Sequence, residues 1–248
     1  MNLLIDLGNT NVKWAWHRDR GLYDFDQRNH GCDSIGAIVD AMADGMHRPT
    51  AIWLAGVAGE KTGELSIALA ETFAMQPVAV EVATPALGIT VGYREAQRLG
   101  VDRWLAMIAA RAGCAGAFCV IDAGTALTVD AVNEDGLHLG GAICPGLGMM
   151  QQSVLRQTAE VAARAVDVAR PSGLFADDTA AAVVAGSVFA AVGLVERAAR
   201  ELEKICGDPP MLFLTGGAAG MIAPHIERDV HVLRELVLRG LAQVAAGD

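Results

Sequence analysis

The sequence has 248 residues, of which 52% are hydrophobic and 19% charged, and this composition excludes a chain that is disordered throughout. The 19 basic and 29 acidic residues leave a formal net charge of −10, so a sequence-independent nucleic-acid binder is not expected, because phosphate backbones would repel the chain. Five cysteines without a C-x-x-C pair argue against a disulfide framework and against a zinc ribbon.

The sequence also predicts neither a secretory signal nor a membrane span. The N-terminus, MNLLID, has no basic region, and Asp6 interrupts its apolar stretch. Residues 136–155 form the longest run without a charged side chain, but glycines, a proline and two glutamines break it. Residues 179–195 are rich in alanine, and we interpret them as too short and too weakly apolar for a good span. We therefore expect a cytoplasmic protein that does not bind membranes.

The apolar periodicity predicts alternating strands and helices along the whole chain. Val12, Trp14 and Trp16 alternate with other residues, which places them on one face of a strand that returns from a first strand ending at Asp6. Ser34 is a candidate helix cap. In chain order, the remaining predictions are a helix over 34–43, a strand over 51–55, a helix over 62–73, a strand over 78–82, a helix over 102–112, strands over 119–121, 127–132 and 137–142, one helix or a pair of helices over 178–204, a strand over 211–214 and a helix over 232–244.

Two segments of the chain resemble each other. Residues 4–13 read LIDLGNTNVK and residues 120–129 read VIDAGTALTV, with an offset of 116 residues. Each has two apolar residues, an Asp, one further residue, a Gly, a short turn and a second strand-like run. We interpret this echo as two related domains, residues 1–116 and residues 117–248, each of which opens with a β-hairpin.

The turn of the first hairpin is a candidate phosphate site. It reads Asp6-Leu7-Gly8-Asn9-Thr10-Asn11-Val12-Lys13. A turn of small polar residues between two strands can point several backbone N–H groups in one direction, which makes a concave anion site. Asp6 could hold Mg²⁺ directly or through water, while Thr10 and Asn11 add donors and Lys13 adds a positive charge. Taken alone, the segment is more readily interpreted as an ordinary hairpin turn.

The second hairpin, from Asp122 to Thr128, strengthens the phosphate interpretation. Two Asp-x-Gly turns, one in each half of the chain, would supply two phosphate-binding turns for one nucleoside triphosphate. Thr125 would donate to a phosphate, and Asp122 would face a cation. The alternative is a turn left over from a duplication that binds no ligand. Further on, Thr215-Gly216-Gly217 follows a strand, where the backbone could closely approach an adenine or ribose.

A fourth segment, residues 93–103, reads YREAQRLGVDR. Asp102 and Arg103 lie where an apolar helix is predicted to begin. They could be a general base beside a cation that orients an anionic substrate. Asp102 could equally be an acid that favours the helix N-terminus, and Arg103 a solvated partner of a carboxylate.

Two glycine-containing segments do not match known nucleotide motifs. Gly59-Glu60-Lys61-Thr62 looks like the end of a P-loop, but Glu60 stands where the second Gly is required and would oppose a phosphate. Gly146-Leu147-Gly148 lacks the third Gly of a dinucleotide fingerprint. The six histidines show no spacing typical of a metal site.

Taken together, the motifs closely resemble those of type III pantothenate kinase, in the same order and over essentially the whole chain. The motifs that carry the resemblance are D-x-G-N-T-x-x-K from Asp6, G-x-D-R at 100–103, D-x-G-T at 122–125, G-G-A-I-C-P-G-L at 140–147 and the later T-G-G. The two Asp-x-Gly motifs are shared with the wider actin-like superfamily. The resemblance implies an α/β fold of two related actin-like (ribonuclease H-like) domains, with mixed sheets flanked by helices.

The resemblance also implies an activity, namely transfer of the γ-phosphoryl group of ATP to the 4′-hydroxyl of pantothenate, the first step of coenzyme A synthesis. It implies that residues 6–13 and Thr125 surround ATP with Mg²⁺, and that Asp102 is the base for the hydroxyl. Asp122 would bind a monovalent cation, K⁺ or NH₄⁺. The pantothenate site would include Tyr93, Gly100, Val101, Asp102, Arg103 and Thr179. A homodimer is also implied.

Two other functions stay open from the sequence. The chain could be an actin-fold kinase for another small acid or sugar, because such kinases share the ATP motifs. It could also be an ATP-binding regulatory protein without kinase activity, although the intact Asp102-Arg103 pair argues against this.

Overall fold

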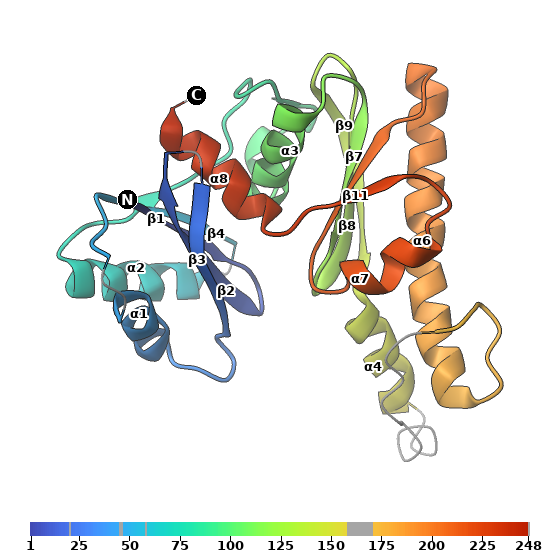
Figure 1. Ribbon diagram of the computed structural model, residues 1–248, viewed down its shortest axis with the longest axis horizontal. Coiled ribbons are helices and arrows are strands. Elements are labelled where there is room, and N and C mark those ends of the chain that lie inside the picture. The colour runs from blue at the N-terminus through green and yellow to red at the C-terminus, as the bar shows by residue number, and fades with distance from the viewer. Residues whose placement is uncertain (20, 45–46, 58, 158–170, 248) are drawn as a thin grey trace. The chain divides into compact units, whose positions relative to one another are not determined.

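The structure is a computed structural model that describes residues 1–19, 21–44, 47–57, 59–157 and 171–247 (Figure 1). The chain divides into two compact units. The first comprises Met1–Gly113 together with Glu235–Asp248, and the second comprises Cys114–Arg234. Each unit is built around its own mixed β-sheet and its own hydrophobic core.

The sheet of the first unit begins with the predicted hairpin. Its strands are β1 (Asn2–Leu7), β2 (Asn11–Arg18), β3 (Gly21–Asn29), β4 (Ala51–Gly56) and β5 (Val78–Ala79), in the spatial order β3-β2-β1-β4-β5. β1 is antiparallel to β2 and parallel to β4. The strand predicted over 78–82 is shorter than expected, because β5 covers only Val78–Ala79. β3 was not predicted, because most of its side chains are exposed and show no apolar alternation.

Helices cover both faces of this sheet. They are α1 (Ile35–Ala43), α2 (Glu60–Phe73), α3 (Val101–Gly113) and α8 (Leu236–Ala246), and two shorter elements, β6 (Thr90–Val91) and η1 (Ala96–Arg98), lie between α2 and α3 in the sequence. Trp14 and Trp16 pack with α1 and α2, as the period-2 pattern predicted. The hydroxyl of Ser34 accepts a hydrogen bond from the backbone N–H of Ala37, which confirms the predicted cap of α1.

The sheet of the second unit repeats the topology of the first. Its strands are β7 (Phe118–Ala123), β8 (Ala126–Val132), β9 (Leu137–Pro145), β10 (Met211–Thr215) and β11 (Val230–Val232), in the spatial order β11-β10-β7-β8-β9. β7 is antiparallel to β8 and parallel to β10, as β1 is antiparallel to β2 and parallel to β4. The internal echo in the sequence therefore corresponds to a duplicated fold.

The helices of the second unit are α4 (Leu147–Gln157), α6 (Thr179–Cys206) and α7 (Ala219–Ile222), followed by the short η2 (Ala223–His225). Alternate residues of β7 and β8 pack with α6 on one face of the sheet, and Val188, Ala191 and Val195 of α6 are fully part of this core. The long alanine-rich segment therefore folds as one continuous helix, as one reading of the sequence allowed.

The prediction that this segment is too short and too weakly apolar for a membrane span is wrong. Within the described residues, α6 is long and apolar enough to cross a membrane, with 28 residues and a mean hydropathy of 1.8 over 18 of them. In the structure, 44% of that stretch is buried within the protein. A core helix has this composition because alanine and valine allow close packing against a sheet.

The C-terminal helix belongs to the first unit, so residues 117–248 are not one compact unit as predicted. Figure 1 shows α8 beside α3, and the two helices pack closely. A Cβ at Gly240 would overlap the backbone of Leu105, so this close approach requires glycine. The helix predicted over 232–244 also begins later than expected, because β11 occupies residues 230–232.

Candidate functional site

The first candidate site is the turn between β1 and β2. The N–H of Gly8 donates to the carbonyl of Asn11 at 3.0 Å, which closes the turn. Asn9 lies at its exposed tip, and Thr10 is half-buried. Leu7 and Val12, on the two strands, point into the core, so only their backbone groups can contribute to a ligand site.

Asp6 and Lys13 flank this turn. They are direct partners in the β1–β2 register, so their side chains emerge on the same face of the sheet. Asp6 is only 6% exposed. The face that they share is opposite to the core formed with α1 and α2, because Ile5 and Leu7 of the same strand belong to that core. The predicted carboxylate and cation are thus brought together beside the turn.

The second candidate site is the turn between β7 and β8. Asp122 is in register with Thr128 on β8 and with Thr215 on β10, so a carboxylate lies between two threonines on one face of the sheet. Gly124 closes the turn by donating its N–H to the carbonyl of Ala126 at 3.1 Å. This arrangement presents hard oxygen groups of the kind that bind K⁺, Mg²⁺ or Ca²⁺.

Two further glycine segments converge on this second turn. The N–H of Gly146 donates to the carbonyl of Thr125 at 3.0 Å, and a Cβ at Gly146 would overlap the backbone of Gly124 and Thr125. Gly216 has a φ of +94°, and a Cβ there would overlap Asp122 and the backbone of Ala123. The T-G-G motif, which we expected beside an adenine or ribose, thus packs against the Asp122 turn.

This convergence was not predicted. Gly146 was set aside because its motif lacks a third glycine, and the signal that could have identified it is the G-G-A-I-C-P-G-L resemblance. Position 146 requires a residue without a side chain, and a missing side chain gives no chemical signal in the sequence.

The third candidate site lies at the start of α3. Asp102 Oδ1 accepts a hydrogen bond from the N–H of Arg103 at 2.8 Å. The guanidinium of Arg103 donates to the hydroxyl of Tyr93 at 3.1 Å and lies over its ring, 5.8 Å from the centroid. A Cβ at Gly100 would overlap the Asp102 carboxylate. The structure therefore brings these four predicted residues together, whereas Val101 points into the core at 8% exposure.

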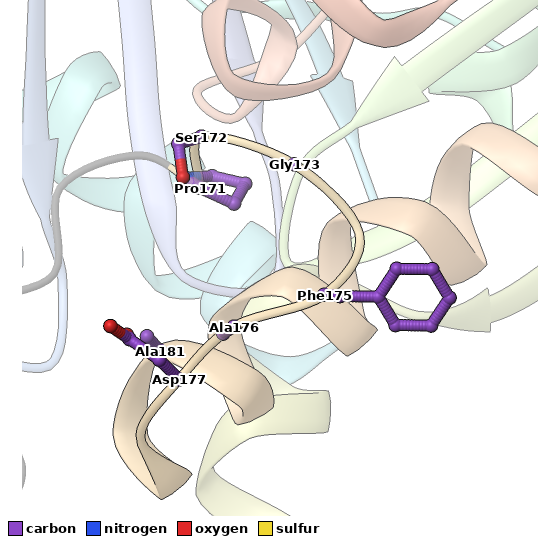
Figure 2. Close-up of a pocket in the computed structure, with 7 residues that line it drawn as sticks. All are labelled: Pro171, Ser172, Gly173, Phe175, Ala176, Asp177 and Ala181. Carbon is purple, nitrogen blue, oxygen red and sulfur yellow. The ribbon is translucent and has the colours of Figure 1, made fainter.

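The segment before α6 forms the fourth candidate site. Asp178 caps the helix by accepting from the N–H of Ala181 at 2.9 Å, and Thr179 is the first helical residue. Residues on both sides of Thr179 in the sequence line the pocket drawn in Figure 2. Its volume is about 480 Å³. Phe175 is 93% exposed, and its ring points away from the loop (Figure 2). The pocket is lined by Pro171, Ser172, Gly173, Phe175, Ala176, Asp177 and Ala181. Thr179 is not among them.

Among the residues that the structure describes, no group of three or more His, Cys, Asp or Glu side chains could hold a metal ion. Mg²⁺ at a nucleotide site is commonly held by one or two carboxylates together with phosphate oxygens and water.

Sequence comparison identifies a family. The family model for type III pantothenate kinase matches residues 2–201. The type III pantothenate kinase of Burkholderia multivorans is 36% identical over 265 residues, which cover 99% of this chain and 96% of the relative. That of Chromobacterium violaceum is 35% identical over 250 residues, which cover 99% of both proteins. The resemblance inferred from the motifs is thus confirmed over nearly the full length.

Structural comparison supports the fold. A Sinorhizobium meliloti protein provisionally named a 2-dehydro-3-deoxygalactonokinase superposes with a TM-score of 0.62 at 16% identity, covering 99% of this chain and 96% of that one. The ethanolamine utilization protein EutJ of Carboxydothermus hydrogenoformans superposes with a TM-score of 0.54 at 13% identity, covering 97% and 88%. At such identities the likeness is one of fold, and it agrees with the predicted actin-like α/β architecture.

Proposed function

We infer the roles of individual residues from the premise that this chain belongs to the type III pantothenate kinase family. It is a kinase that uses ATP to phosphorylate pantothenate in coenzyme A biosynthesis. The duplicated hairpin supports different roles for Asp6 and Asp122, because it sets them at matching strand positions with different neighbours.

We assign the binding of ATP phosphates to each of the Asp-x-Gly turns. The first turn, from Gly8 to Asn11, supplies backbone and side-chain donors, and Lys13 supplies a positive charge. Thr125 in the second turn adds a hydroxyl. Asp6 would hold Mg²⁺, which when bound neutralises charge on the transferring phosphoryl group. The register partnership of Asp6 with Lys13 supports this assignment, because both groups emerge on one face.

Asp102 is the proposed general base. The 4′-hydroxyl of pantothenate is a weak nucleophile, so a carboxylate that accepts its proton assists the attack on the γ-phosphorus. Asp102 Oδ1 already accepts the N–H of Arg103, which orients the carboxyl group. Arg103, aligned by Tyr93, would bind the pantothenate carboxylate. Alignment of the two substrates and neutralisation of charge would provide most of the acceleration.

Asp122 is the proposed ligand of K⁺ or NH₄⁺. Its register neighbours Thr128 and Thr215 offer two hydroxyls on the same face of the sheet. A carboxylate with neutral oxygen groups suits a cation of single charge.

We further propose a cytoplasmic homodimer that binds neither nucleic acid nor membrane. The net charge of −10 supports the first exclusion. Burial of much of α6 in the core of the second unit supports the second. Thr179, at the start of that helix, is the proposed contact of substrate near the dimer interface. The exposed ring of Phe175 nearby supports an interface in this region.

The experiment that tests this function is ADP release by the purified full-length protein with ATP, Mg²⁺, K⁺ and pantothenate, with each component omitted in turn. We expect release that depends on pantothenate and is stimulated by K⁺. Binding of ATP without pantothenate-dependent release would contradict the proposed division of roles. Release with another small acid or sugar, but not with pantothenate, would overturn the substrate.

A further inference from the structure

His30, which follows β3, contacts the first Asp-x-Gly turn at two places. Its backbone N–H donates to the carbonyl of Thr10 at 3.2 Å. Its ring nitrogen Nε2 lies 3.0 Å from the carbonyl oxygen of Gly8. Two carbonyls of this turn, those of Gly8 and Thr10, are therefore held by one residue that lies 22 positions from Gly8 in the sequence.

Lys61, near the start of α2, contacts His30. Its ammonium nitrogen lies 2.7 Å from the ring nitrogen Nδ1 of His30 and donates to the backbone carbonyl of His30 at 3.0 Å. Both side chains are partly buried. Lys61 belongs to the Gly59-Glu60-Lys61-Thr62 segment, which resembles a P-loop but lacks its second glycine.

These contacts select one form of the imidazole. The Gly8 carbonyl can only accept a hydrogen bond, so Nε2 of His30 must carry the proton and donate. The ammonium of Lys61 can only donate, so Nδ1 must offer its lone pair. Lys61 thus stabilises the neutral tautomer that bonds to the turn.

The contacts also orient the peptide groups of the turn. A trans peptide is planar, and its C=O and N–H point in opposite directions. Because the carbonyls of Gly8 and Thr10 point toward His30, the N–H groups of Asn9 and Asn11 point away from it. Carbonyl oxygens would repel a phosphate, so holding them against His30 favours anion binding on the opposite side of the turn.

We propose that His30 is a positioning residue for the ATP-binding turn, and that Lys61 acts through it by fixing its tautomer. The proposal rests on the assignment of this turn to the ATP phosphates. The Gly59–Thr62 segment then serves phosphate binding indirectly, without a P-loop.

The test compares steady-state kinetics of the full-length enzyme and its variants, with ATP and pantothenate varied separately. We expect His30→Ala to raise the KM for ATP about threefold to tenfold, the range for loss of the one side-chain hydrogen bond to the turn. The KM for pantothenate and kcat should change by less than about twofold, since that bond does not touch pantothenate. His30→Gln should restore part of the loss, because its amide N–H can replace Nε2.

Lys61→Met should raise the KM for ATP about threefold. In the His30→Ala background the same change should add little, because most of its effect passes through the imidazole. Two matched controls lie elsewhere on the surface. His47→Gln removes a histidine paired with Asp24, and Lys204→Met removes a lysine paired with Glu201. Both should leave the KM for ATP unchanged.

Nitrogen NMR of the labelled histidines provides a second readout. His30 should show the neutral form protonated at Nε2, and Lys61→Met should weaken that preference while the fold is retained. An unchanged KM for ATP in His30→Ala would overturn the proposal. A fall in kcat and a rise in the KM for pantothenate that are as large as the rise in the KM for ATP would also overturn it. If the wild-type protein shows no pantothenate-dependent turnover, the proposed function fails instead, and equilibrium binding of ATP to the same variants then decides this proposal by itself.

Discussion

Asp6 and Asp122 occupy the same position in the two sheets, each as the fifth residue of its strand. Their register partners differ. Asp6 pairs with Lys13, whereas Asp122 pairs with Thr128 and Thr215. The lysine beside Asp6 adds a positive charge, whereas the two hydroxyls beside Asp122 extend an oxygen ligand set. The duplication has thus produced two carboxylates with different neighbours.

Asp122→Ala is expected to abolish stimulation by K⁺, because it removes the only charged group of the proposed ligand set. Turnover should be measured against K⁺ concentration at saturating ATP and pantothenate. Asp135→Ala, on the exposed turn between β8 and β9, is the control and should retain the K⁺ dependence. Retention of that dependence in Asp122→Ala would remove this residue from the cation site.

Asp102→Asn is expected to lower kcat by roughly 10²-fold or more, which is the usual contribution of a general base. ATP affinity should persist, because the amide oxygen can still accept the Arg103 N–H and keep the helix start intact. Asp40→Asn, an exposed change on α1, serves as the control. Near-normal turnover in Asp102→Asn would leave the carboxylate with only a helix-terminal role.

Gly216→Ala should destabilise the protein by about 1–3 kcal/mol, because its φ of +94° is strained for alanine and the new methyl group would overlap Ala123. Gly217→Ala is a matched control one residue away, where an added Cβ meets nothing within 4 Å. Urea unfolding of the two variants measures the difference. Equal stabilities would show that the backbone at Gly216 adapts without cost.

Cys32 and Cys119 should differ sharply in reactivity. Burial raises the pKa of the Cys119 thiol from 9.0 to about 12, and the neighbouring Asp130 carboxylate adds to the rise. The reactive thiolate is therefore scarce at neutral pH, whereas Cys32 is exposed. Mass spectrometry after alkylation at pH 7.5 should find Cys32 modified first and Cys119 modified only after denaturant is added. Equal labelling of both in the native protein would contradict this.

The same thiol predicts a loss of stability in alkali. Because the pKa of Cys119 is higher in the folded protein than its ordinary value of 9.0, its contribution to stability is complete below about pH 9 and falls as the pH rises toward 12. The free energy of unfolding should therefore fall less steeply between pH 9 and 10.5 in Cys119→Ala than in the wild type. Parallel slopes would exclude Cys119 as a source of the alkaline decline.

The hairpins could be predicted because their signals are local. Alternating apolar residues from Val12 to Trp16 and the Asp-x-Gly turns define both strands and their faces. β3 lacks such a signal, since Tyr23 and Phe25 are exposed on it. The place of α8 in the first unit depends on packing against Leu105, which is far away in the sequence.

The candidate site shows the same difference between local signals and contacts of residues that are far apart in the sequence. The chemical groups at Asp6, Asp102 and Asp122 were visible in the sequence as motifs. The contacts of His30 with the first turn and of Lys61 with His30 were not, because these partners are 22 and 31 positions apart in the sequence. Gly146 could not be placed either, since its contribution is a missing side chain beside Gly124.

The return of α8 to the first unit has a consequence for biosynthesis. Residues Cys114–Arg234 form a continuous insertion within Met1–Gly113 and Glu235–Asp248. The ribosome therefore completes the inserted domain while the amino-terminal domain still lacks its final helix. An incomplete or shortened translation product would expose the α3 surface that Gly240 normally covers, and the defect would appear in the part of the protein that was made first.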